Sequence, residues 1–239
     1  MKLEEFNYDL PKELIAQEPA EPRDSCRLMM VDKKTGEWEH HHFRDILDEI
    51  REGDVFVFNN TKVIPARLYG KKKDTGGKVE MLLLTPKGND TWEVLVNPGR
   101  KALPGVEIEF AENCYCKVLD KTEFGGRLVE FHYDGNFDSL LDQIGEMPTP
   151  PYIHKKLGNN DEYQTVYAKY KGSAAAPTAG LHFTPELMEE MKKKGAKLLF
   201  VTLHVGIGTF RPVSEENIED HEMHKEWYTV SEETAKEVN

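Results

Sequence analysis

The stretch Val106-Glu107-Ile108-Glu109-Phe110 shows how the middle of this 239-residue chain folds. Apolar and acidic residues alternate with a period of two, which places the apolar side chains on one face of a β-strand. Four neighbouring segments have strand-like sequences, at residues 78–85, 91–96, 114–119 and 127–133. Pro98-Gly99, Pro104-Gly105 and Gly125-Gly126 supply turns between them. Short strands at this spacing predict a small antiparallel β-barrel.

Helices and strands alternate on both sides of this region. Residues 54–58 and 197–204 are expected strands, and residues 185–194 an expected helix with Thr184 as N-cap. Prolines mark both borders, with Pro65 on one side and Pro148, Pro150 and Pro151 on the other. The predicted fold is an α/β main domain with an inserted antiparallel β-barrel domain. We expect residues 1–65 and 148–239 to form the discontinuous α/β domain and residues 66–147 the barrel.

The overall charge restricts the function classes. There are 31 basic and 43 acidic residues, giving a net charge of −12, which does not favour a nucleic-acid binder that relies on general charge. Local basic patches remain possible contacts. Three cysteines argue against a disulfide framework and for a reducing cytoplasm. No apolar run is long enough for a membrane span, so we expect no membrane attachment.

Residues 172–183, Gly-Ser-Ala-Ala-Ala-Pro-Thr-Ala-Gly-Leu-His-Phe, carry no charged group apart from one imidazole. Small side chains let a backbone approach a ligand closely, and Gly180 can adopt a positive φ. One interpretation is a ligand-binding loop that presents His182 beside the following helix. The alternative is a packing seam of small residues with a core histidine.

Two further segments follow expected strands. Asn59, Asn60, Thr61 and Lys62 come after residues 54–58, and ligands of α/β folds lie at such strand ends. His204 ends the other strand and leads into Gly206-x-Gly208-Thr209. The third glycine of a dinucleotide fingerprint is missing, so this segment is either a turn that approaches another ligand or a plain turn.

His221 and His224 raise the question of a metal. The zincin pattern needs histidines at i and i+4, whereas these are at i and i+3, and no further ligand is evident. His40, His41 and His42 lie on an expected strand, so they point to alternating faces. We therefore predict no metal site. Histidines beside acidic residues can instead bind or move a proton.

Six segments occur in an order that resembles the S-adenosylmethionine:tRNA ribosyltransferase-isomerase family of queuosine biosynthesis. They are residues 59–67, 147–153, 163–167, 175–183, 201–210 and 219–226. The resemblance extends over nearly the whole chain. Members of the family also have an α/β domain with an inserted β-barrel.

The resemblance implies that the ribosyl part of S-adenosylmethionine is transferred and isomerised onto 7-aminomethyl-7-deazaguanine in the anticodon of a tRNA. The product is epoxyqueuosine, and adenine and methionine are released. S-adenosylmethionine is then a substrate, and no cofactor is expected. The chemistry needs proton transfer, which implies catalytic roles among His182, His204, His221 and His224. The implied substrate-binding residues are Asn59, Asn60, Thr61, Lys62, Arg67, Tyr163, Gln164, Pro177, Thr178, Gly180, Gly206, Gly208, Thr209 and Glu226.

Two departures from the family pattern stand out. Ala174 replaces a common valine, and the family's chain continues beyond Asn239 with a Gly-Thr-Thr-Ser turn and an Asn-Phe-His-Leu-Pro segment. We therefore expect a truncated chain, and an inactive fragment of the enzyme is one alternative. Others are a non-catalytic tRNA-binding module on the barrel, a metal hydrolase and a methyltransferase. The last would normally carry a glycine-rich loop where residues 59–62 have none.

Overall fold

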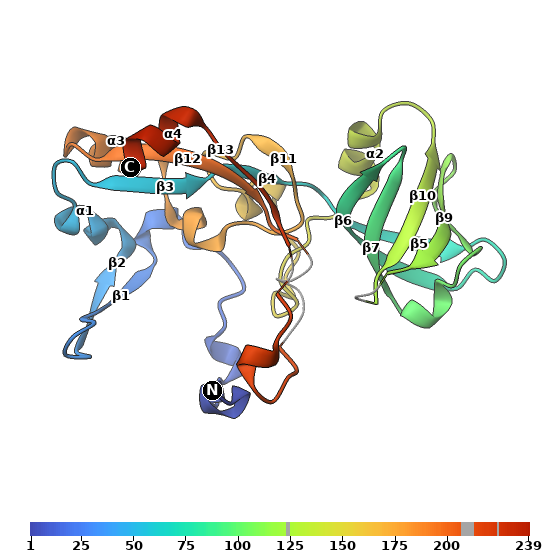
Figure 1. The fold of residues 1–239 in the computed structure, drawn as a ribbon, viewed down its shortest axis with the longest axis horizontal. Coiled ribbons are helices and arrows are strands. Elements are labelled where there is room, and N and C mark those ends of the chain that lie inside the picture. Colours follow the sequence, from blue (N-terminus) through green and yellow to red (C-terminus); the bar gives the residue numbers. More distant parts are fainter. Residues whose placement is uncertain (123–124, 207–212, 224) are drawn as a thin grey trace.

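The computed structural model describes the chain except for residues 123–124, 207–212 and 224. The molecule is elongated, with a β-barrel at one end and a lobe of helices and small sheets at the other (Figure 1). The chain leaves the second lobe through β4 (Thr61–Val63), completes the barrel, and returns for its last third. This arrangement confirms the predicted fold class, an α/β lobe with an inserted antiparallel barrel.

The barrel closes in the order β10-β7-β6-β5-β8-β9, and every neighbouring pair is antiparallel. Its strands are β5 (Arg67–Lys72), β6 (Lys78–Gly88), β7 (Thr91–Asn97), β8 (Glu107–Ala111), β9 (Cys114–Lys121) and β10 (Arg127–Tyr133). Alternation buries Ile108 of the quoted stretch while Glu109 is exposed. Leu68, Met81 and Leu83 are fully buried in the same interior.

Helix α2 (Phe137–Ile144) packs against the barrel interior. Leu141 is buried in the barrel core, and Phe137 and Leu140 pack against it. The Asn136 side chain caps the helix by accepting a hydrogen bond from the Ser139 amide. These elements lie within residues 66–147, but the exact domain boundaries stay a prediction.

The central sheet of the other lobe has the order β13-β12-β3. Strand β3 (Val55–Asn59) runs parallel to β12 (Lys197–His204), and β13 (Trp227–Val230) is antiparallel to β12. A separate parallel pair joins β4 to β11 (Tyr170–Ser173), and an antiparallel hairpin joins β1 (Arg27–Val31) to β2 (Trp38–His42). Because β3 and β12 are parallel, both end at the same edge of the sheet.

Among the described residues of this lobe, the α-helices are α1 (Ile46–Glu49), α3 (Pro185–Lys193) and α4 (Glu232–Val238). Thr184 caps α3 by accepting a hydrogen bond from the Leu187 amide, as the sequence predicts. Leu187, Met188 and Met191 are buried in a core that includes Phe58 of β3. This packing holds α3, and the loop that precedes it, against the sheet.

Candidate active site

The ends of β3 and β12 are joined by side-chain hydrogen bonds. Asn59 donates from Nδ2 to the Leu203 carbonyl (2.9 Å) and accepts at Oδ1 from the Leu203 amide (3.0 Å). Asn60 accepts at Oδ1 from the Thr202 hydroxyl (2.6 Å). The side-chain amides of Asn59 and Asn60 therefore hold the strand ends together. Their role in a site at this edge is structural, because these hydrogen bonds are made to the protein and not to a ligand.

His204 is tightly held at this edge. Its Nδ1 is 2.8 Å from the hydroxyl oxygen of Thr61, and the Trp227 indole stacks on the imidazole with ring centroids 4.8 Å apart. Gly172 packs against the ring, because a Cβ added there would lie 2.8 Å from Nε2. His204 also lines a cavity of about 780 Å³. Held in one orientation, such a histidine suits proton transfer to a bound molecule.

The loop after β11 reaches the same place. The Ala174 amide donates to the Val205 carbonyl (3.0 Å), and the Ser173 hydroxyl accepts from the Val205 amide (2.9 Å). The Gly206 amide donates to Oε1 of Glu226 (2.8 Å). Thus the two segments that the sequence places at strand ends meet here, together with the first residues of the loop 172–183, and Glu226 lies beside them. Whether S-adenosylmethionine binds at this place stays a prediction.

The small-residue loop combines both interpretations offered by its sequence. Ala174, Ala175 and Ala176 are buried, so this part is a packing seam. The following 3₁₀ helix η7 (Thr178–His182), with Pro177 at its N-terminus, lines a cavity. Gly180 does not have the positive φ that its sequence allows; it is required for space, because an added Cβ would lie 2.1 Å from the Tyr167 hydroxyl.

His182 lies at the end of η7 and lines a different cavity, of about 610 Å³, together with Thr178. Its Nδ1 is 3.0 Å from Sγ of Cys26. The structure therefore does not bring His182 and His204 into one cavity, although both belong to or contact the loop of residues 172–183. Burial lowers the pKa of both histidines, so each is a neutral imidazole at neutral pH.

The remaining predicted residues have mainly structural partners. Gln164 pairs with the backbone of Val63, donating to its carbonyl (2.7 Å) and accepting from its amide (3.0 Å). Tyr163 is buried in a small core with Val63 and also lines the cavity of His182. Arg67 donates to the Thr149 carbonyl (3.1 Å) and forms an ion pair with Glu80. Lys62 is a half-buried residue of β4.

His221 is placed away from these groups. It follows the 3₁₀ helix η9 (Ile218–Asp220), which lies beside the N-terminus (Figure 1). Its Nδ1 is 2.9 Å from Oε2 of Glu215, and this hydrogen bond lowers the pKa of Glu215 to about 2. The predicted residues His224, Gly208 and Thr209 lie outside the described residues.

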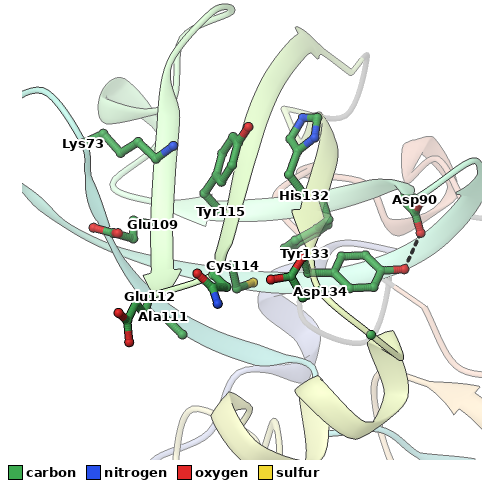
Figure 2. Close-up of a pocket in the computed structure, with 13 residues that line it drawn as sticks. Lys73, Asp90, Glu109, Ala111, Glu112, Cys114, Tyr115, His132, Tyr133 and Asp134 are labelled. Carbon is green, nitrogen blue, oxygen red and sulfur yellow. Dashed lines mark hydrogen bonds between the residues drawn. The ribbon is translucent and has the colours of Figure 1, made fainter.

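A third cavity, of about 670 Å³, lies on the barrel. Lys73 sits over the Tyr115 ring, and Tyr115 stacks on His132 with ring centroids 4.7 Å apart (Figure 2). Tyr133 donates a hydrogen bond to Asp90 across the same cavity (2.5 Å). None of the site residues predicted from sequence lines this cavity.

Within the described residues, no three or more His, Cys, Asp or Glu side chains are grouped as metal ligands. The described part of the chain also contains no helix with the length and apolar character needed to cross a membrane.

Three residues in these sites escape the sequence reasoning. Trp227 supports His204, Ser173 bridges two loops, and Cys26 contacts His182. Cys26 lies 156 positions before His182, so no local spacing could signal the pair. Trp227 directly follows Glu226, which the sequence analysis does include. An aromatic residue next to a predicted site residue is the sequence signal that could have pointed to Trp227.

Comparison with known proteins adds the family. A family model described as "Queuosine biosynthesis protein" matches residues 3–239. An S-adenosylmethionine:tRNA ribosyltransferase-isomerase of Thermoanaerobacter sp. (strain X514) is 58% identical over 240 residues, which is 100% of this chain and 70% of that protein. The enzyme of the same name from Caldanaerobacter subterraneus subsp. tengcongensis is 57% identical, with the same coverage.

A crystal structure titled S-adenosylmethionine tRNA ribosyltransferase, from Thermotoga maritima, is 36% identical with a TM-score of 0.41. The match covers 98% of this chain and 64% of that chain. Given the family model and the two curated relatives, this chain belongs to the queuosine biosynthesis protein family.

Proposed function

We propose that this protein transfers and isomerises the ribosyl moiety of S-adenosylmethionine onto tRNA. The names of its relatives describe this activity. His204 is the observation from the structure that supports this proposal most. Its neutral imidazole is held in place by Thr61 and Trp227 at the edge where β3 and β12 end. A fixed imidazole of low pKa can accept a proton, which removal of a C5′ proton beside a sulfonium requires.

The finer parts of the proposal concern the substrates. The tRNA base is 7-aminomethyl-7-deazaguanine in the anticodon, the product is epoxyqueuosine, and adenine and methionine leave. S-adenosylmethionine lies against the strand ends, with Gly206 allowing close approach of the backbone and Glu226 adding negative charge near the sulfonium. The reaction takes place in the cytoplasm, in keeping with the free cysteines Cys26, Cys114 and Cys116.

The test is to incubate the protein with S-adenosylmethionine and tRNA that carries the aminomethyl base. The proposal predicts one adenine and one methionine released for each base modified, and a gain of the ribosyl mass by the tRNA. Release of S-adenosylhomocysteine would instead identify a methyltransferase. Binding of tRNA without any binding of S-adenosylmethionine would favour a tRNA-binding module.

A further inference from the structure

One wall of the cavity that His182 lines is formed by residues 16–20, which we call the strap. Residues 149–157 contribute another wall, and Cys26 also lines the cavity. The volume is about 610 Å³, a size that small-molecule sites have. A segment that forms a wall of such a cavity can control access to the groups inside it.

The strap is weakly attached to the rest of the fold. None of its side chains is buried, and it belongs to no helix or strand. Its amides and carbonyls make no hydrogen bonds to other backbone groups of the described residues. Segments with few buried contacts and few backbone hydrogen bonds open locally at a low free energy. The strap therefore separates from its neighbours far more easily than a strand of the barrel does.

The chain is fixed on both sides of the strap. After it, Arg23 donates to the carbonyls of Gln164 (2.5 Å) and Asp161 (2.6 Å). Before it, the Leu3 amide donates to the Glu216 carbonyl (2.9 Å). The strap lies in the blue segment between the N-terminus and β1 (Figure 1). It can move away from the cavity while both flanking segments stay attached.

Gln17 joins the strap to the opposite wall. Its side chain donates from Nε2 to the Tyr152 carbonyl (2.9 Å) and accepts at Oε1 from the His154 amide (2.8 Å). Glu18 also pairs with Lys155, but both side chains are exposed, and exposed ion pairs contribute little. The two hydrogen bonds of Gln17 are therefore the main polar link across the cavity.

We propose that the strap is a lid on this cavity and that Gln17 holds it closed. With both hydrogen bonds made, the strap shields His182 and Cys26 on this side. When the bonds break, the strap moves away and the cavity opens to small molecules. Gating segments of enzymes work in this way, by local motion on a fixed scaffold. The inference goes beyond the proposed function, because it concerns access to the cavity and not the molecule that enters.

Cys26 reports directly on opening. It lines the cavity, whereas Cys114 and Cys116 are buried in the barrel core. N-ethylmaleimide labels the thiols, and peptide mass spectrometry separates their rates. When closing is faster than labelling, the rate follows the open population. Gln17→Ala should therefore speed labelling of Cys26 about tenfold, the effect of losing two neutral hydrogen bonds.

Gln143→Ala is the matched control. Gln143 is an exposed residue of α2 outside the cavity, so the same substitution there should leave labelling of Cys26 unchanged. In Gln17→Ala, the urea midpoint and the labelling of Cys114 and Cys116 should also stay unchanged, because the strap buries no side chain. These readouts separate local opening from loosening of the whole protein.

Hydrogen exchange on the unmodified chain gives a second measurement that needs no variant. The His154 amide should be protected by Gln17, since it donates to that side chain. Its protection should be weaker than that of the Val118 amide, which donates to the Val106 carbonyl within the barrel.

Four outcomes overturn the proposal. They are an unchanged Cys26 rate in Gln17→Ala, an equal rise in Gln143→Ala, a parallel rise for Cys114 and Cys116, and an unprotected His154 amide. No readout uses turnover. Absence of ribosyl transfer would therefore refute the proposed function and leave the lid standing, and an unresponsive Cys26 would do the reverse.

Discussion

Replacement of Gly172 by alanine should displace His204 and destabilise the fold. Gly172 has φ of 146°, a conformation that strains any residue with a side chain, at about 1–3 kcal/mol. The added Cβ would also lie within 2.8–3.0 Å of Nε2, Cε1 and Cδ2 of His204. Overpacking of that kind costs about 1–3 kcal/mol. The free energy of unfolding should therefore fall by about 2–6 kcal/mol in total.

Gly36→Ala provides the matched control. Gly36 also has a positive φ, of 74°, but an added Cβ there would meet nothing within 4 Å. The Gly36→Ala variant should lose only the part of the free energy of unfolding that comes from backbone strain, roughly 1–2 kcal/mol. Urea unfolding, monitored by tryptophan fluorescence, measures both variants, and their difference estimates the contact with His204.

His204→Ala removes the ring that the new methyl group would strike. In the Gly172→Ala, His204→Ala double variant the two losses should therefore not add, and the coupling should be about 1–3 kcal/mol. Equal destabilisation by Gly172→Ala and Gly36→Ala, or strict additivity in the double variant, would show that Gly172 does not hold His204 in place.

Thr184→Ala should lower the free energy of unfolding by about 1 kcal/mol because α3 loses its N-cap, and Thr184→Ser should recover most of it; urea midpoints measure both. The depressed pKa of Glu215 means that its pairing with His221 stabilises the protein above pH 4.5, with the contribution lost as pH falls toward 2. His221→Ala should weaken that acid dependence, because the His221 hydrogen bond is the largest of several interactions that lower the pKa of Glu215. A wild-type acid transition in the variant would refute the pairing. The hydrogen bond with Asp90 raises the pKa of Tyr133 to about 12. The stabilisation of the fold by this hydrogen bond is therefore present below pH 10 and is lost between pH 10 and 12. Asp90→Asn should lower the pKa of Tyr133 in a phenolate absorbance titration, and an unchanged titration would contradict the assigned cause.

The barrel could be predicted from sequence because its signals are local. Alternation such as that of Ile108 and Glu109 is set by burial of one strand face, and turn residues separate the strands. Thr184 was recognisable as a helix cap for the same reason, since its hydroxyl accepts a hydrogen bond from the amide three residues ahead. Such patterns depend only on neighbouring residues.

The candidate sites were predictable in part. Parallel strands bring their carboxyl ends to one edge, so the meeting of Asn59 with the end of β12 follows from the strand assignment. Which histidines share a cavity depends on how distant segments pack. Cys26 reaches His182 only through the tertiary fold, and His182 and His204 line different cavities although both lie near the loop of residues 172–183.

A crystal structure of the protein with bound S-adenosylmethionine tests the central claim most directly. The account predicts the ribose and sulfonium at the end of β12, in contact with His204 and the backbone of Gly206, with Glu226 nearby. S-adenosylmethionine bound elsewhere, for example in the barrel cavity lined by Tyr115 and His132, with His204 free of contacts, would contradict it.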